Sequence, residues 1–514
     1  MARIQDTAGR RGRRRGGGQT APLRKPDYTH LRHPFQPQPA FSDDAVQAMH
    51  DTALRVLEEL GLKVLLPEGR AVFREVGAIV DDDTEMVRIG RDIIEQALKT
   101  APRSFVLHAA NPDRAQTFEL GAMLFMAGAG CPHATDRLRG RRPGSLRDFE
   151  ETLMLQQSFD VIHVLGPSAE PQDVPVALRH YAMTRAQLAL TDKPMFVYAR
   201  GTPQVLECFE MIQRARGLDQ AGFEDGVWAT TIINSNSPRQ LDRPMTQGII
   251  DFARHNQLSV ITPFCLAGAM APITVSGALT LQHAEALAGI ALAQHVRPGA
   301  PVAYGGFSSN VDMKSGSPAF GTPEHIKAAL GTGQLARHIG LPWRGAAGSA
   351  ANISDAQAAN ETVMSAWGAV LANATVTVHA AGWLEGGLSF GYEKFINDVE
   401  SLQTFAELCI PPGGDAAEIG FDAIADVKPG GHFFATAHTM ERYQTAFYAP
   451  LVADLSNFGS WSEAGGLTST ERATDIWQSV LTGFEPPSGG AEAADRIDQF
   501  IADRTARGGA PPES

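Results

Sequence analysis

Residues 357–380 read QAANETVMSAWGAVLANATVTVHA, and this stretch contains one complete unit of a pattern that recurs along the chain. A helix-length segment, Gln357–Ala372, is followed by a short apolar run, Val376–Ala380. A short, mainly apolar run of this length is typical of a parallel strand that is buried on both faces. The stretch is therefore predicted to be a helix followed by a strand, which is the repeating element of α/β proteins.

The apolar run occurs eight times, at spacings of roughly 30 to 40 residues that suit a strand–helix unit. The runs are Met123–Ala127, Val161–Leu165, Met195–Tyr198, Val227–Ile233, Ser259–Phe264, Pro301–Tyr304, Pro342–Ala347 and Val376–Ala380. The predicted helices are Leu146–Gln157, Val176–Leu190, Pro203–Arg214, Met245–Asn256, Ala278–Gln294, Pro323–Ile339, Gln357–Ala372 and Tyr392–Leu408. Eight regular units predict an α/β fold, a (β/α)8 barrel of the TIM type.

An open, doubly wound sheet is the competing architecture. It would carry a glycine-rich phosphate loop after its first strand, but Gly128 and Gly130 do not fit the G-x-G-x-x-G spacing there. The barrel is therefore the preferred fold.

The chain divides into four parts by composition. Residues 1–34 carry nine Arg or Lys against two Asp, and we expect a flexible Arg/Gly-rich tail, either solvated or binding an acidic partner or a neighbouring subunit. Residues 35–120 are predicted to form an N-terminal helical cap with a hairpin, and residues 121–410 the barrel. Residues 411–514, which follow Pro411-Pro412-Gly413-Gly414, are predicted to form a mostly helical C-terminal extension.

The charge and cysteine content exclude several functional classes. A formal net charge of −13 argues against binding to nucleic acid or to an anionic membrane surface. The four cysteines form no CxxC pair, which predicts a reducing cytoplasm rather than a disulfide framework. No segment is long and apolar enough to span a bilayer.

Metal and nucleophilic chemistry are also poorly supported by the motifs. A catalytic zinc needs three convergent ligands, often with a close pair, and His432 and His438 are too far apart in sequence to form one. The chain has no G-x-S-x-G motif, and Cys131 and Cys265 have no activating neighbour in the sequence. We therefore expect no metal site in this chain.

The loops that follow the predicted strands carry the candidate site, because barrel enzymes build their active sites there. These loops are rich in aromatic, amide and hydroxyl groups. Aromatic faces attract quaternary ammonium groups, at about 0.5 to 2 kcal/mol each. The predicted substrate-binding residues are Tyr198, Arg200, Asn234, Phe264, Tyr304, Phe307, Arg344, Trp383 and Tyr392. Each aromatic residue taken alone is better explained by packing at the barrel mouth, and only the group favours a binding site.

His379 is the most informative single position. It follows the run Thr375–Val378 and so lies at the C-terminal end of the last predicted strand, where a histidine is as often functional as structural. Glu385 is an ionisable group on the same loop. We predict that His379 and Glu385 are the catalytic residues.

Several sequence blocks, spread from about Leu31 to Pro487, carry a family resemblance. They include Thr262-Pro263-Phe264 with Ala271–Thr274, Gly386-Gly387-Leu388 with Tyr392-Glu393-Lys394, Gly430–Phe433 with His438-Thr439, and Glu485-Pro486-Pro487. With these blocks the chain resembles the trimethylamine methyltransferase family, and specifically its members without pyrrolysine.

The resemblance implies a barrel methyltransferase that moves a methyl group from a methylated amine to the cobalt of a separate corrinoid protein. Because the chain has only ordinary residues, the resemblance implies a quaternary amine such as glycine betaine as substrate. The chain has no D-x-H-x-x-G corrinoid-binding motif, so we expect no cofactor on this chain and a corrinoid (cobalamin) supplied by the partner protein. We also expect a homo-oligomer.

Two other functions stay open at this stage. One is a zinc-dependent barrel methyltransferase that acts on methylated corrinoid and a thiol. The other is a non-catalytic barrel that binds a betaine.

Overall fold

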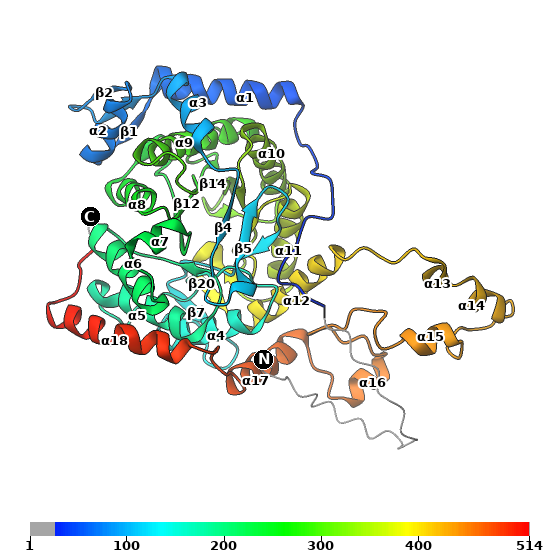
Figure 1. Cartoon of the computed structure of the whole chain (residues 1–514). Helices are drawn as coiled ribbons and strands as arrows, with labels where there is room; N and C mark the ends of the chain where they lie inside the picture. The colour runs from blue at the N-terminus through cyan, green and yellow to red at the C-terminus, as the bar shows by residue number, and fades with distance from the viewer. Residues whose placement is uncertain (1–25, 513–514) are drawn as a thin grey trace.

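The computed structural model describes residues 26–512, and a curled parallel sheet forms its centre (Figure 1). The sheet has seven strands in the order β6-β18-β17-β14-β12-β10-β9. Their bounds are β6 Leu124–Phe125, β9 Met195–Phe196, β10 Ala229–Ile233, β12 Leu258–Ile261, β14 Val302–Gly305, β17 Trp343–Ala346 and β18 Val376–Val378. Every pair of neighbouring strands is parallel, so all the C-terminal ends lie at one edge. The mixed α/β class predicted from the sequence is confirmed.

The predicted strand Val161–Leu165 is the exception. It forms one parallel bridge, between Val164 and Met126, and the Leu165 N–H donates to the carbonyl of Pro194 at 3.2 Å. The run does not form a longer ladder of backbone hydrogen bonds because a side chain takes one of the donors. The Phe125 N–H donates to His163 Nδ1 (2.9 Å) rather than to a backbone carbonyl. The sheet therefore has seven strands where the sequence predicted eight.

Helices follow the strands and surround the sheet (Figure 1). They are α4 Leu146–Ser158, α5 Val176–Leu190, α6 Thr202–Arg216, α7 Gln220–Asp225, α8 Arg243–Arg254, α9 Val275–Val296, α10 Pro323–Ile339, α11 Ala356–Leu371 and α12 Tyr392–Leu408. Side chains cap the N-termini of several of them. The Ser145 hydroxyl accepts the Asp148 N–H at α4, and Thr274 does the same for Gly277 at α9. Local sequence thus sets where these helices begin.

The N-terminal region covers one end of the sheet. Its elements are α1 Asp43–Arg55, the π-helical turn η1 Val56–Leu60, β1 Leu62–Val64, α2 Pro67–Glu75, β2 Ile79–Asp81, β3 Met86–Arg88, α3 Arg91–Thr100, β4 Ser104–Leu107, η2 Pro112–Arg114 and β5 Gln116–Glu119. β4 and β5 form the predicted antiparallel hairpin. Leu107 and Phe118 of this hairpin pack with Val260 and Val376 of the sheet, so the hairpin contributes to the core.

The predicted flexible tail, 1–34, lies outside the described residues as far as position 25. The described remainder is bound to the body: Tyr28 and Leu31 are buried, and the Tyr28 carbonyl bonds with His163 Nε2 at 2.8 Å. Local composition gave no sign of these two apolar contacts.

Short strands connect the loops that follow the sheet strands. They are β7 His133–Thr135, β8 Arg142–Pro143, β13 Leu266–Ala267, β15 Ser309–Val311, β16 Pro318–Ala319, β19 Trp383–Leu384 and β20 Ser389–Gly391, with the 3-10 turn η3 Glu385–Gly387. β11 Gln240–Leu241 instead pairs with β1. Two small sheets, β13-β15-β16 and β19-β20-β7-β8, therefore hold these loops together.

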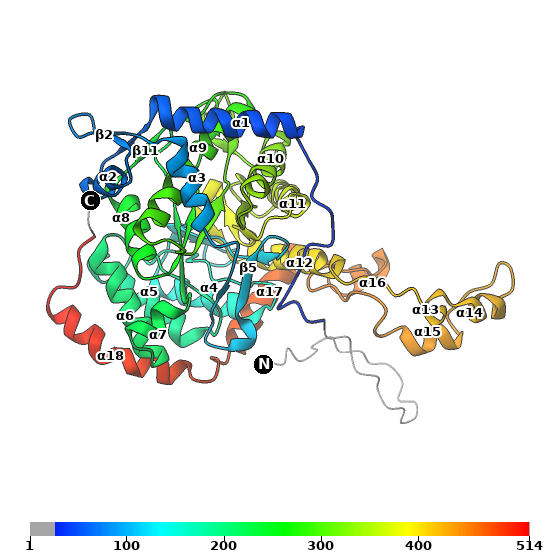
Figure 2. The same cartoon turned by 45° about the horizontal axis from the view of Figure 1, so that its top comes forward.

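The C-terminal region contains α13 Ala416–Ile419, α14 Phe421–Asp426, α15 Ala437–Arg442, α16 Phe458–Glu463, α17 Ser469–Thr482 and α18 Gly490–Ala506. α17 packs against α12, and α18 packs against α5 and α6. The segment between α12 and α17 projects from the body in both views (Figures 1 and 2). Within residues 26–512 no helix combines the length and hydropathy needed to cross a membrane.

Candidate functional site

Five rings meet near the C-terminal ends of three strands of the sheet, β12, β14 and β18. Phe264 follows β12, Phe307 and Phe320 follow β14, and His379 and Trp383 follow β18. Ring centroids lie 4.8 Å apart for Phe264 and Phe307, 5.9 Å for Phe307 and Trp383, and 5.1 Å for Phe320 and Trp383. We call Phe264, Phe307, Phe320, His379 and Trp383 the aromatic cluster. It brings together three aromatic residues and the histidine that the sequence singled out.

Phe320 was missed by the sequence analysis. It lies on the same connection as Phe307 and stacks on it with centroids 5.6 Å apart. The available signal was its position directly before Gly321 and the start of α10 at Pro323, at the end of a strand-end loop.

Glycine backbones enclose the Trp383 ring. A Cβ on Gly348, whose φ is +126°, would lie 2.3 Å from Trp383 Cε3, and one on Gly387 would lie 2.6 Å from Cζ2. Only glycine allows both the positive φ of these positions and this close approach. The glycines of the loops after β17 and β18 therefore hold the indole in place.

His379 has an unusual backbone and a defined tautomer. Its φ is +61°, a conformation that non-glycine residues rarely adopt outside sites that require it. Its Nδ1 accepts the Ala129 N–H at 3.3 Å, and its ring stacks on Trp383 with centroids 4.4 Å apart. Burial and the nearby Arg344 cation lower the pKa of His379 well below its usual value. The imidazole is therefore neutral near pH 7.

Arg344 is a buried cation beside the cluster. Arg344 is a residue of β17 and is only 1% exposed. Its guanidinium carbon lies 4.3 Å from the centre of the Phe307 ring. Nη1 donates to the Gly306 carbonyl at 3.1 Å, whereas Nε has no acceptor within residues 26–512. Burial lowers the pKa of Arg344 to about 9, so it stays charged at neutral pH.

The charge of Arg344 lacks a carboxylate partner. In the part of the chain that the structure describes, none of the Asp–Arg or Glu–Arg ion pairs includes it. A buried cation is costly unless an anion or hydrogen-bond acceptors compensate it. The site can therefore accept a negatively charged group at this guanidinium.

The structure does not place Tyr304 in the cluster. Its hydroxyl contacts the Gln282 Nε2 at 3.3 Å and His283 Nδ1 at 3.1 Å, both on α9. Tyr304 is the third residue of β14, and successive side chains of a strand point to opposite faces. Its neighbour Ala303 packs with Val260 and Val376 inside the curled sheet. Tyr304 therefore points the other way, toward the surrounding helices.

Charged side chains hold Tyr392 and Glu385 in place. The Tyr392 hydroxyl donates to Glu151 at 2.8 Å, and Arg139 lies over its ring at 4.8 Å. Glu385 accepts from Arg141 Nε at 2.9 Å and from the Ser389 hydroxyl at 2.7 Å. Burial disfavours the charged form of Glu385, but these hydrogen bonds outweigh burial and lower its pKa. Both side chains therefore act first as parts of the loop structure.

The other predicted site residues lie at neighbouring strand ends. Arg200 Nη2 approaches the Tyr198 hydroxyl at 3.5 Å after β9, and Asn234 Nδ2 donates to the Thr262 carbonyl at 2.9 Å after β10. These contacts join Tyr198 with Arg200, and Asn234 with the β12 loop, rather than with the aromatic cluster.

Metal-ligating and thiol groups do not form a second centre. Across residues 26–512, no three His, Cys, Asp or Glu side chains are grouped so that they could hold a metal ion. Burial raises the pKa of the Cys131 and Cys265 thiols, which leaves both protonated and weakly nucleophilic.

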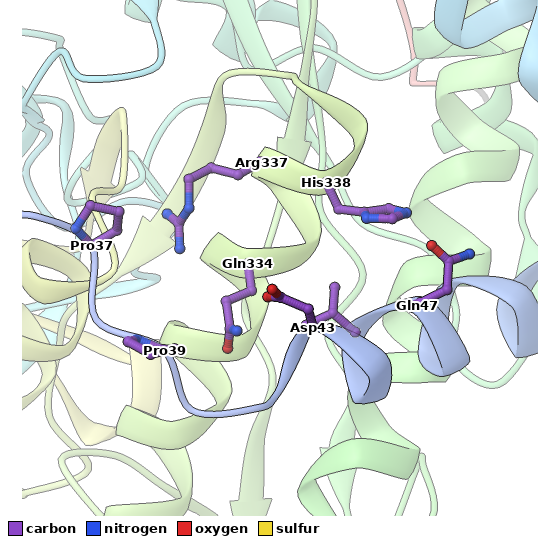
Figure 3. Close-up of a pocket in the computed structure, with 8 residues that line it drawn as sticks. Pro37, Pro39, Asp43, Gln47, Gln334, Arg337 and His338 are labelled. Carbon is purple, nitrogen blue, oxygen red and sulfur yellow. The ribbon is translucent and has the colours of Figure 1, made fainter.

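A surface pocket lies between the segment 37–47 and the last turns of α10 (Figure 3). Gln334, Arg337 and His338 line one side of it and Asp43 the other. The end of α10 leads into β17 through Leu341 and Pro342, so this pocket is at the N-terminal end of the strand. It is remote from the strand ends that carry the aromatic cluster.

Residues 7–509 match the family model described as trimethylamine methyltransferase (MTTB). The glycine betaine methyltransferase of Desulfitobacterium hafniense (strain Y51) is 33% identical over 465 residues, which cover 90% of this chain and 96% of that protein. A trimethylamine methyltransferase of D. hafniense (strain DSM 10664 / DCB-2) is 28% identical over 452 residues, 87% of this chain and 90% of that protein.

Among solved structures, the monomethylamine methyltransferase of Methanosarcina barkeri superposes with a TM-score of 0.49 at 11% identity, covering 90% of this chain and 88% of that one. The sequence matches confirm the predicted family. This chain belongs to the trimethylamine methyltransferase family, and it is a methyltransferase.

Proposed function

We propose that the chain transfers a methyl group from a quaternary amine bearing a carboxylate, such as glycine betaine, to the Co(I) of a corrinoid carried by a separate protein. One observation carries the choice of substrate. Arg344 is a buried guanidinium with a free Nε–H and no carboxylate partner within the described residues, and it adjoins the aromatic cluster.

The charge of Arg344 distinguishes between the amines of this family. Trimethylamine is a cation when protonated and has no anionic group, so it would add positive charge beside a buried guanidinium. Glycine betaine has a carboxylate, which can accept charge-assisted hydrogen bonds from Arg344 and compensate its charge. The relative named glycine betaine methyltransferase supports the same choice.

The aromatic cluster suits the other end of such a substrate. Faces of Phe307, Phe320 and Trp383 can surround a trimethylammonium group by cation–π attraction. Because His379 is neutral, it places no opposing charge there. We propose that these rings bind the ammonium group and that Arg344 binds the carboxylate.

The chemistry then requires mainly positioning. A quaternary nitrogen has no lone pair, so its methyl group is already electrophilic and needs no protonation. The corrinoid of the partner supplies the nucleophilic cobalt that accepts the methyl group. The C–N bond breaks with its electron pair staying on nitrogen, and a neutral tertiary amine leaves. The chain's residues hold the cation so that one methyl faces outward, an effect of orientation.

We further propose that Val161–Leu165 completes an eight-stranded barrel, with 35–120 and 411–514 as its N-terminal cap and C-terminal extension. The bridge of Val164 to β6 and the hydrogen bond of Leu165 to Pro194, beside β9, support this closure. Tyr198, Arg200 and Asn234 would then form the opposite wall of the site. Three of the four cysteines are buried free thiols, which supports a reducing, cytoplasmic location.

Methyl transfer to free cob(I)alamin tests the function directly. Glycine betaine, tetramethylammonium and trimethylamine would be compared, with methylcobalamin followed by absorbance and dimethylglycine by mass spectrometry. We expect methylcobalamin and dimethylglycine in equal amounts from glycine betaine and no transfer from the other two amines. Transfer from tetramethylammonium at the betaine rate would contradict the role of Arg344. Tight betaine binding without transfer would favour the non-catalytic alternative, and zinc-dependent transfer would favour the zinc enzyme.

A further inference from the structure

The segment 411–468, between α12 and α17, is an arm without a core of its own. It contains α13, α14, α15 and α16, and none of these four helices buries a residue. Figures 1 and 2 show it extending away from the body in two views. Its outer part is held together mainly by polar contacts, such as His438 Nε2 with the Ala417 carbonyl at 3.1 Å.

The base of the arm is fixed to the body. The Tyr448 hydroxyl donates to Gln403 at 3.0 Å, and the Val452 N–H donates to Glu400 at 2.9 Å, both on α12. The arm returns to the body at α17, which packs against α12. These contacts fix the direction in which the outer part of the arm leaves the body.

The arm exposes large apolar side chains along its length. Nine of them are between 57% and 82% exposed: Ile419, Phe421, Ile424, Phe434, Met440, Tyr443, Phe447, Leu455 and Phe458. With on the order of 150 Å² for each large side chain, these residues offer roughly 1,000 Å² of surface. A stable interface buries about 800 Å² on each partner, so the arm alone supplies enough for one.

We propose that the arm packs against a second copy of this chain, so that two copies exchange arms about a two-fold axis. A segment with no core stays folded only while another surface covers its apolar side chains. A corrinoid protein that binds and dissociates in each catalytic cycle would leave these side chains exposed for part of the time. A second copy of the chain is always available in the same amount, so it can cover the arm permanently. In a two-fold pair each arm is covered reciprocally, which doubles the buried area.

The charge of the arm excludes polyanionic partners. Residues 411–468 contain seven Asp or Glu and two Lys or Arg. This negative segment would be repelled by nucleic acid or by an anionic membrane. The proposed pairing does not depend on the substrate proposed above.

Sedimentation velocity on the full chain tests the proposal, with Phe434→Asp/Phe447→Asp as the variant. Ile79→Asp is the matched control, because Ile79 is 60% exposed but lies in β2 of the N-terminal region. We expect at least twice the 55.0 kDa mass of one chain for the wild type and the control, and 55.0 kDa for the variant. Circular dichroism will show that the variant keeps its fold.

Hydrogen exchange locates the interface independently. We expect peptides from 411–468 to be protected in the wild type and to exchange at least tenfold faster in the double variant. A wild-type mass of 55.0 kDa at micromolar concentration would overturn the proposal. An unchanged mass of the double variant, or rapid exchange of the arm within a wild-type oligomer, would overturn it equally.

Discussion

His379 and Trp383 stack with their ring centroids 4.4 Å apart and their planes 19° apart, although the chain between them turns from β18 into β19. The contact depends on the positive φ of His379 and on the glycines that enclose the indole. A strained backbone and a closely fitted ring at the end of a strand are features that a substrate-binding site explains better than packing alone.

Arg344→Gln should weaken the binding of glycine betaine by at least tenfold. The neutral amide cannot form a charge-assisted hydrogen bond with the carboxylate, a loss of about 1.5 to 3 kcal/mol. Isothermal titration calorimetry measures the affinity. Arg344→Lys keeps the charge and should bind better than the Gln variant. Equal affinity of the Gln variant and the wild type would remove Arg344 from the binding site.

Trp383→Ala should weaken betaine binding by tenfold or more, because it removes a ring face from the ammonium group. Tyr304→Phe is the matched comparison, since its hydroxyl contacts Gln282 and His283 rather than the aromatic cluster. We expect near wild-type affinity for Tyr304→Phe in the same titration. The reverse order of effects would show that Tyr304, not Trp383, contacts the substrate.

Gly348→Ala should lower the melting temperature and change the fluorescence of Trp383. Its Cβ would fall 2.3 Å from the indole at a φ of +126°, so the ring must move. Gly77→Ala has a positive φ of +93°, also beyond the left-handed helical region, but no atom within 4 Å of its Cβ. The Gly77 variant measures the effect of backbone strain without a clash, and only a larger effect at Gly348 supports the close fit of the indole.

The stability of the protein should fall as the pH falls below about 6.5. Burial lowers the pKa of His325 to about 4 and that of His163 to about 3, each from 6.5. The unfolded chain therefore binds more protons than the folded chain in this window, and each such group costs about 1.4 kcal/mol per pH unit. The stabilisation is complete above pH 6.5 and is lost as the pH falls from there to about 4 for His325 and to about 3 for His163.

Thermal unfolding from pH 7.5 to 4.5 checks this dependence, with His325→Gln as the variant. We expect the decrease of the melting temperature with pH to be smaller in His325→Gln than in the wild type. His432→Gln replaces an exposed histidine and should match the wild-type slope. Parallel slopes for His325→Gln and the wild type would show that His325 is not one of the groups responsible.

Much of the candidate site could be predicted because parallel strands place their C-terminal ends together. Phe264, Phe307, His379 and Trp383 each lie at or just after the C-terminal end of a predicted strand, and the structure brings all four into contact. Tyr304 was predicted on the same grounds, but β14 extends to Gly305. Tyr304 therefore follows the alternation of the strand and faces α9. A residue inside a strand must keep this alternation, whereas the first loop residue after the strand need not.

Hydrogen bonds to charged side chains determine the place of two further residues, Tyr392 and Glu385. Tyr392 begins α12, close to the strand ends, yet its hydroxyl is bound by Glu151 and Asp148 of α4. Glu385 is bound by Arg141 from the β7–β8 connection. These partners are more than 200 positions away in the chain, and single-sequence patterns do not report such long-range pairs.

By itself the sequence determined the alternation of strands and helices, the ends of the helices and the family, because these depend on local periodicity, capping residues and motifs. Only the tertiary structure decided that Arg344 lies buried beside the aromatic cluster without a carboxylate partner in the described chain, that seven strands form the continuous sheet, and that the arm leaves the body without a core. The physical reason is that burial, charge compensation and side-chain direction depend on residues that are distant in the chain and meet only when it folds.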